Sequence, residues 1–148
     1  MISEYFYFKT ILVSGPYGGG GGEDWCEEGR GGVAGVEVRA GAWVDSVRLL
    51  RGGEWGAARG GGGGQPATLL LQPGDSVVAV AGTTDGRLVT QLQFSTARGA
   101  TLGPVGAGAG RRWECAAPAG WELSHLSGRA GMFLDSLTVH WRPSQGPH

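Results

Sequence analysis

Two short segments of the chain share a frame of residues that could hold a small polar ligand. Residues 131–135 read Gly-Met-Phe-Leu-Asp, residues 41–45 read Gly-Ala-Trp-Val-Asp, and serine and alternating aliphatic residues follow each segment. A turn that begins with glycine and ends with aspartate can direct backbone N–H groups and one carboxylate toward the same point. Because a carboxylate can accept hydrogen bonds from two neighbouring hydroxyl groups, this frame suits the hydroxyls of a sugar.

The segments that must position these motifs alternate between apolar and polar residues. The alternation is clear at residues 36–39, 47–49, 91–95 and 134–142. No window keeps the three-to-four spacing of an amphipathic helix, and glycine- or proline-containing turns separate the segments at short intervals. The sequence therefore predicts an all-β fold made of short strands.

Glycine runs divide the chain into comparable parts. Residues 18–22, 60–64 and 106–110 are glycine-rich and recur at intervals of about 40 to 50 residues, as in a repeated supersecondary unit. The motifs at 41–45 and 131–135 belong to two repeats, and in the middle repeat we place residues 73–78 at the same position. This arrangement predicts threefold pseudo-symmetry with one eroded copy.

Composition narrows the classes of function. The chain has 148 residues, enough for one domain with a core, and apolar segments between its 31 glycines argue against disorder of the whole chain. Its 12 basic and 13 acidic residues give a net charge of −1, and no basic stripe supports nucleic-acid binding. No apolar stretch approaches the ~18 residues of a membrane span. Residues 1–13 carry Glu4 and show no clear signal peptide, and we expect a first strand there.

No set of residues predicts catalysis or metal binding. His125, His140 and His148 are far apart in the sequence and lack metal-ligand spacing with the cysteines, and we expect His140 on a solvated strand face. Neither a hydrolase elbow nor a phosphate-binding loop is present. The sequence therefore predicts a protein that is not an enzyme and needs no cofactor.

Two further groups of residues leave alternatives open. Cys26 and Cys115 could form a single bridge, although two buried thiols are the simpler interpretation. Glu27 and Glu28 lie close to Asp24 and could form a carboxylate cluster for calcium, but such a run more often forms a solvated turn. We expect no metal site there.

Several longer motifs carry a resemblance to a known family. Residues 15–25 contain a five-glycine run followed by Glu-Asp-Trp, residues 71–77 read Leu-Gln-Pro-Gly-Asp-Ser-Val, and residues 128–136 end in Leu-Asp-Ser. Together with His140 and Trp141, these segments resemble the jacalin-related lectins, and most closely the vertebrate zymogen-granule lectin branch. Tyr17 stands where that family usually has tryptophan. The resemblance covers about residues 14–142 of a single domain, residues 1–148. It implies a β-prism I fold of three four-stranded Greek-key sheets.

The resemblance also implies a carbohydrate site. The first glycine run and residues 131–135 would lie side by side, with Gly131 opening the second loop. Gly22, Met132 and Phe133 would offer backbone N–H groups, and the carboxylate of Asp135 would accept hydrogen bonds from two sugar hydroxyls. The alternative for Asp135 is that its carboxylate only caps the local turn.

Residues of the other repeats have weaker implied roles. Asp85 and Arg87, in the middle loop, would sit at the rim of the site and adjust its specificity. Some relatives use the copy around Asp45 as a second sugar site, here with Gly63 beside it. For this copy we favour an inherited structural turn over a second site.

These observations predict a carbohydrate-binding lectin, in secretory granules or outside the cell, with glycans or glycoproteins as partners. Mannose is the favoured sugar because galactose-binding relatives free the amino group of the loop glycine by cleavage, whereas 21 residues precede Gly22 here. Binding of sulfated glycosaminoglycans is disfavoured, since only Arg87 and Arg98 lie near the middle loop. The alternative is a β-prism scaffold for protein interaction with a degenerate sugar site. A glycosidase is weaker still, because Asp135 lacks a partner carboxylate. The oligomeric state stays open.

Overall fold

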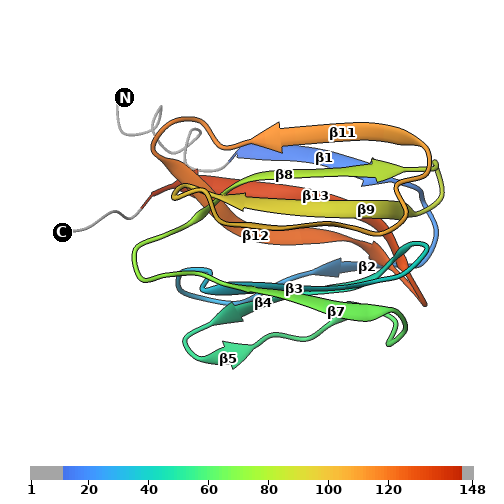
Figure 1. The fold of residues 1–148 in the computed structure, drawn as a ribbon, viewed down its shortest axis with the longest axis horizontal. Coiled ribbons are helices and arrows are strands. Elements are labelled where there is room, and N and C mark those ends of the chain that lie inside the picture. The colour runs from blue at the N-terminus through green and yellow to red at the C-terminus, as the bar shows by residue number, and fades with distance from the viewer. Residues whose placement is uncertain (1–11, 145–148) are drawn as a thin grey trace.

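Thirteen strands make up the fold in the computed structural model, which describes residues 12–144 (Figure 1). They form three antiparallel sheets, and no helix occurs among the described residues. The first sheet has the order β1 (Leu12–Gly18), β13 (Leu134–Pro143), β12 (Trp121–Ala130) and β2 (Glu23–Cys26). The second contains β5 (Glu54–Trp55), β4 (Val44–Arg51), β3 (Gly35–Ala40) and β7 (Gln65–Leu70), with β6 (Arg59–Gly60) also paired to β4. The third has the order β10 (Thr101–Val105), β9 (Val89–Thr96), β8 (Val77–Thr84) and β11 (Arg111–Ala116).

The three sheets repeat one plan. The short strands β5 and β6 pair with successive parts of β4, so together they fill one strand position, and each sheet has four positions. In every sheet the two central strands form a hairpin: β12 with β13, β3 with β4, and β8 with β9. The predicted all-β fold and its threefold pseudo-symmetry are therefore confirmed, and the architecture is a β-prism.

Inward-facing residues of the central strands form one core. Val36 and Val38 of β3, and Leu92 and Phe94 of β9, are fully buried, as the alternation of the sequence predicted. Trp141 of β13 is also buried, and its indole N–H donates to Ser14 Oγ at 3.0 Å, so its polar atom is satisfied. Each fully buried aliphatic side chain of this kind contributes about 1.5–3 kcal/mol to stability.

All three glycine loops lie at one end of the prism, together with the tips of the three central hairpins (Figure 1). Residues 18–22 join β1 to β2, residues 60–64 join β6 to β7, and residues 106–110 join β10 to β11. The last glycine of each loop has a positive φ: 70° at Gly22, 73° at Gly64 and 100° at Gly110. This left-handed conformation favours glycine, which explains why the runs recur at equivalent points.

Some sequence-based expectations need correction. Residues 73–78 cover the end of the connection from β7 to β8 and the first two residues of β8, and they do not occupy the place of the aspartate motif. Its true counterpart is residues 86–90, from the tip of the β8–β9 hairpin into the start of β9. Cys26 and Cys115 are free thiols, and Cys26 is exposed rather than buried. The strand expected in residues 1–13 begins at Leu12, and its earlier part lies outside the described residues, as does His148. Within the described part of the chain, no helix is long and apolar enough to cross a membrane.

Candidate functional site

The carboxylate of Asp135 faces the first glycine loop, at the start of β13. A β-carbon at Gly21 would lie 2.7 Å from Asp135 Oδ2, and one at Gly22 would lie 2.6 Å from Oδ1. The backbone N–H of Gly19 donates to the carbonyl of Asp135 at 2.8 Å, which ties the two loops together. Gly22 also has a positive φ, and a β-carbon there would lie 2.6 Å from the backbone of Ala130, so this position requires glycine. The loop thus holds its backbone directly against the carboxylate. We call residues 18–22 and 131–135 together the Asp135 cradle.

Arg129 fixes the glycine loop from its other side. Its Nε donates to the carbonyl of Gly21 at 3.0 Å and its Nη2 to the carbonyl of Gly22 at 2.7 Å, while Nη1 pairs with Asp24 Oδ1 at 2.7 Å. A planar guanidinium suits several acceptors at fixed spacing. The arginine therefore holds the loop rigid without engaging the carboxylate of Asp135. Sequence reasoning missed Arg129, because it is more than a hundred positions away from the loop it binds.

The predicted donors lie on the β12–β13 hairpin next to the glycine loop. A β-carbon at Gly131 would lie 3.8 Å from the Cα of Gly22, and the N–H of Gly131 donates to the carbonyl of Phe133 at 3.0 Å. Gly131 thus shapes the turn, and the structure brings all five predicted site residues into two adjacent loops. Donation by the N–H groups of Gly22, Met132 and Phe133 to a ligand stays a prediction.

The copy around Asp45 has the same geometry. A β-carbon at Gly63 would lie 2.7 Å from Asp45 Oδ2, and one at Gly64 would lie 2.6 Å from Oδ1. Arg39 donates to the carbonyls of Gly63 and Gly64, at 3.0 Å each. Asp45 is only 6% exposed. Burial raises its pKa, and the positive charge of Arg39 only partly offsets this effect. We call residues 41–45 and 60–64 together the Asp45 cradle.

The middle repeat is closed at the equivalent position. Thr90 stands where the other repeats have aspartate, and its hydroxyl lies 2.6 Å from that of Thr83 and donates to the carbonyl of Ala109 at 2.6 Å. Thr83 and Thr90 are both buried. The Thr90 hydroxyl at the acceptor position is therefore already hydrogen-bonded within the protein, and this repeat offers no cradle.

The predicted rim residues lie beside the Asp135 cradle. Gly19 packs against the backbone of Gly86 and Arg87, and the side chain of Arg87 is exposed. The carboxylate of Asp85 accepts from the N–H groups of Leu88 and Arg87 at 2.9 Å each, and these bonds hold its pKa below the usual value. Asp85 thus caps the hairpin turn. Any effect of Asp85 or Arg87 on specificity stays a prediction.

Arg98 does not lie near the middle loop, contrary to the expectation from the sequence. It is in the turn between β9 and β10, at the other end of β9, where its N–H donates to Asp75 Oδ1 at 3.1 Å. Only Arg87 of the two arginines therefore adjoins the Asp135 cradle.

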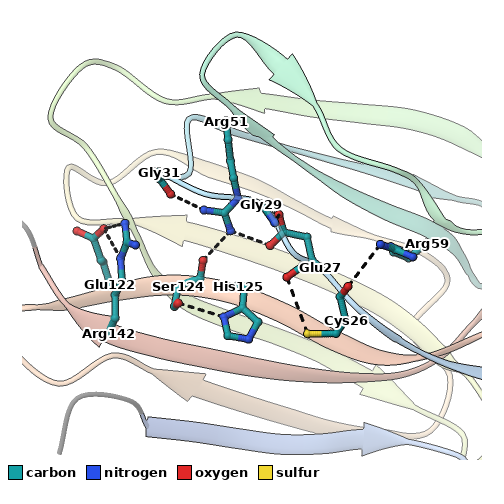
Figure 2. A network of polar contacts seen from close by, with 10 residues as sticks. All are labelled: Cys26, Glu27, Gly29, Gly31, Arg51, Arg59, Glu122, Ser124, His125 and Arg142. Atoms are coloured by element: carbon teal, nitrogen blue, oxygen red, sulfur yellow. Dashed lines mark hydrogen bonds and ion pairs between the residues drawn. The ribbon is translucent and has the colours of Figure 1, made fainter. Parts of the chain in front are cut away.

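A separate polar network, away from the cradles, contains Glu27, which was expected in a solvated turn. Glu27 is buried and forms a two-point ion pair with Arg51, with Arg51 Nη2 to Glu27 Oε1 at 2.7 Å and Nε to Oε2 at 2.8 Å (Figure 2). Arg51 also donates to the carbonyls of Gly31 and Ser124. The network joins β4, β12 and the connection after β2, so its role is structural.

His125 and His140, which are distant in the sequence, are cross-strand neighbours in the first sheet. Their rings stack with centroids 4.1 Å apart, and His140 Nε2 lies 2.7 Å from Ser127 Oγ. His140 is therefore half-buried rather than solvated. Burial lowers the pKa of both rings, and for His140 the neighbouring His125 adds to this effect. Among residues 12–144, no group of three histidine, cysteine, aspartate or glutamate residues could hold a metal ion.

The symmetric sheets and paired glycine–aspartate loops fit the resemblance stated above. The Jacalin-like lectin domain matches residues 14–140 of the chain. The chain belongs to the jacalin-like lectin family. Its described part holds two glycine–aspartate cradles, around Asp135 and Asp45, and a third position closed by Thr90.

Similar proteins agree with this assignment. Zymogen granule membrane protein 16 of Rattus norvegicus is 31% identical over 90% of this jacalin-like chain and 81% of its own length. The structure of the wild-type Malaysian banana lectin is 28% identical, with a TM-score of 0.80 over 90% of this chain and 99% of that chain. The mannose-binding lectin from champedak is 25% identical, with a TM-score of 0.78 over 89% and 97% of the two chains.

Proposed function

We propose that this chain is a mannose-type lectin that binds a pyranose in the Asp135 cradle. The carboxylate of Asp135 accepts hydrogen bonds from two vicinal hydroxyls. The N–H groups of Gly22, Met132 and Phe133 donate hydrogen bonds to the sugar oxygens. One observation carries the proposal. The carboxylate faces a glycine loop that Arg129 holds in place, and no hydrogen bond to that carboxylate is found within residues 12–144.

This arrangement suits a neutral sugar for physical reasons. Hydrogen bonds to a carboxylate are roughly twice as strong as those between neutral groups. Backbone N–H groups in a fixed loop lose little freedom on binding, which reduces the entropic cost. A single pyranose covers little surface, so we expect a dissociation constant on the order of millimolar, or about −4 kcal/mol. Useful avidity then requires several sites.

The choice of mannose has two supports. The champedak lectin is described as mannose-binding, and its structure matches 89% of this chain. In the uncleaved chain the first glycine loop follows β1, so Gly22 carries an ordinary backbone N–H rather than a free amino group.

The setting and mode of action follow the same proposal. The relatives named zymogen granule membrane protein 16 support work in a secretory granule or outside the cell, on glycans or glycoproteins. Binding without catalysis fits a family of lectins and a cradle with one carboxylate, since glycoside hydrolysis needs a pair. Sulfated glycosaminoglycans are not the proposed ligands, because Arg87 is the only arginine of the middle loop.

The Asp45 cradle is a candidate second site. Sequence reasoning favoured a structural turn for Asp45, but Gly63, Gly64 and Arg39 repeat the geometry of the Asp135 cradle. A second pyranose bound there would give one chain two attachment points. The greater burial of Asp45 makes this cradle the tighter one for a ligand to enter.

The experiment is a glycan array and retention on a mannose column, with wild type, Asp135→Ala and Met132→Ala. We expect wild type to bind mannose-containing glycans. Asp135→Ala should lose most of this binding, and Met132→Ala should keep it because position 132 uses its backbone. Asp45→Ala should weaken multivalent retention only. Absence of binding by wild type to any glycan would support the scaffold alternative instead.

A further inference from the structure

An arginine lies beside each cradle at the same place in its sheet. Arg129 of β12 lies opposite Ser136 of β13, and Arg39 of β3 lies opposite Ser46 of β4. The residue before each serine is the aspartate of the cradle. Each guanidinium donates from Nε and Nη2 to the carbonyls of the last two glycines of its loop, at 2.7 to 3.0 Å. The two cradles therefore repeat an arginine as well as an aspartate.

The closed middle repeat lacks both residues. Thr83 lies opposite Gln91, which follows Thr90, so Thr83 takes the place of the arginine and Thr90 that of the aspartate. The carbonyl of Ala109, the residue before the last glycine of this loop, accepts from the Thr90 hydroxyl at 2.6 Å. Here the side chain at the aspartate position holds the loop by itself. Arginine and aspartate thus occur together in two repeats and are replaced together in the third.

The chemistry of the side chains explains this pairing. An ionised carboxylate has no hydrogen to donate, so a loop that faces aspartate needs another donor for its carbonyl groups. A planar guanidinium can donate to two neighbouring carbonyls at fixed spacing. A loop held in this way loses little freedom when a ligand binds. The arginine therefore fixes the loop and leaves the carboxylate free for a ligand.

The arginine of the Asp135 cradle has one further partner. Arg129 lies opposite Asp24 of β2, and its Nη1 pairs with Asp24 Oδ1 at 2.7 Å. Pro66, which has no carboxylate, lies opposite Arg39. Because the side chain of Asp24 is 85% exposed, its ion pair contributes little to the stability of the fold. Its effect is to fix the guanidinium that holds the first glycine loop.

We propose that Arg129 and Arg39 are positioning residues that set the sugar affinity of the two cradles. Each arginine acts through its glycine loop, which it holds against the aspartate. Asp24 strengthens this hold in the Asp135 cradle alone, so that cradle has the higher affinity. This inference rests on the function proposed above, and it adds the residues that rank the two cradles.

The test is a titration with methyl α-mannoside, followed by NMR through the backbone N–H signals of Gly22 and Gly64. Each of these glycines ends the loop of one cradle, so each signal reports one site. For wild type we expect the Gly22 signal to shift at lower sugar concentrations than the Gly64 signal.

Replacing the arginines should affect each cradle separately. Arg129→Ala should weaken binding at the Asp135 cradle roughly three- to tenfold, about the value of one hydrogen bond, and leave the Asp45 cradle unchanged. Arg39→Ala should do the reverse. In Arg129→Ala, relaxation of the Gly21 and Gly22 amide nitrogens should also show larger motion on the picosecond-to-nanosecond timescale, while the second glycine loop keeps its wild-type values.

Two further variants separate positioning from charge. Arg129→Lys keeps the positive charge but lacks the planar fork, so it should restore only part of the affinity. Asp24→Asn leaves both contacts between Arg129 and the loop in place, so its loss of affinity should be smaller than that of Arg129→Ala. Glu114→Gln is the matched control, because Glu114 is also an exposed carboxylate paired with an arginine but lies in the closed repeat. It should bind as wild type does at both cradles.

Thermal unfolding shows whether each variant is folded. Wild-type affinity at the Asp135 cradle in Arg129→Ala overturns the proposal. Full restoration of affinity by Arg129→Lys also overturns it, because the charge alone would then act. Stronger binding at the Asp45 cradle in wild type overturns the role of Asp24. If wild type shows no shift that depends on Asp135, the proposed function itself fails.

Discussion

The two ends of the prism use arginine and carboxylate side chains in opposite ways. At the end away from the glycine loops, Arg51 neutralises Glu27 directly, with side chains only 7% and 8% exposed (Figure 2). Arg142 and Glu122 form a second pair there, at 3.2 Å. Glu27 and Glu122 are therefore neutralised by arginines of the protein itself.

At the loop end, Arg129 and Arg39 bind backbone carbonyls of the glycine loops. No hydrogen bond to the carboxylate of Asp135 or Asp45 is found among residues 12–144. Asp45 is buried as a whole residue, but its oxygens are not among the buried side-chain atoms that lack a partner, so they reach solvent. Ligand hydroxyls can therefore replace water at both carboxylates. At one end, arginines thus pair with Glu27 and Glu122. At the other end, arginines bind the loop backbone, and the carboxylates of Asp135 and Asp45 stay available as acceptors.

The largest effect on stability should come from breaking the Glu27–Arg51 ion pair at the end away from the glycine loops. Arg51→Ala leaves Glu27 as a buried charge without its partner, so we expect the free energy of unfolding to fall by about 3–5 kcal/mol. Chemical denaturation measures this change. Arg112→Ala is the control, because its ion pair with Glu114 is 57% and 74% exposed and should contribute less than about 1 kcal/mol. Equal losses in the two variants would mean that the Glu27–Arg51 pair is not structural.

The next effect should appear at the loop end, on binding rather than on stability. In Gly21→Ala the new methyl group would lie 2.7 Å from Asp135 Oδ2 and must displace the carboxylate. We expect affinity for methyl α-mannoside to fall roughly ten- to hundredfold, the value of one or two charge-assisted hydrogen bonds. Calorimetric titration measures the affinity, and denaturation should show little change.

Gly20→Ala is the matched control for this prediction. A β-carbon at Gly20 would meet no atom within 4 Å, and Gly20 does not have a positive φ. Binding should therefore persist in Gly20→Ala. If both variants bind as wild type does, sugar binding does not depend on the position of the Asp135 carboxylate against the first glycine loop.

Local patterns predicted the parts of this structure that depend on neighbouring residues. Alternation identified strands such as β3 and β13, and glycine runs identified the three loops, because both features follow from backbone geometry. The aspartates of the two cradles could be found because each follows a recognisable turn. The family resemblance then supplied the arrangement of the sheets.

Features that depend on long-range register could not be predicted. Arg129 lies opposite Asp24 only because β12 pairs with β2, and nothing in the local sequence indicates that pairing. His125 lies opposite His140 because the register shifts between Leu123 and His125. In the middle repeat, threonine stands at position 90 in place of aspartate, so the local sequence wrongly favours residues 73–78 as the counterpart of the motif.

The smallest effect should be a pH dependence at the histidine pair near the paired end. Burial lowers the pKa of His125, with Glu27 opposing and Arg51 adding to the shift, and burial together with His125 lowers that of His140. The ordinary value is 6.5, so the unfolded chain takes up these protons first as the pH falls. The stability that the neutral rings provide is complete above that value. It is lost as the pH falls through the lower values of the folded state.

Urea unfolding at about pH 7 and about pH 5 measures this effect, because histidine titrates between these conditions. The midpoint should fall on acidification in wild type, and it should fall less in the double variant His125→Gln/His140→Gln. Carboxylates such as Glu27 are present in both proteins, so their contribution cancels in the comparison. An identical fall in both would show that the stacked rings accept protons without cost.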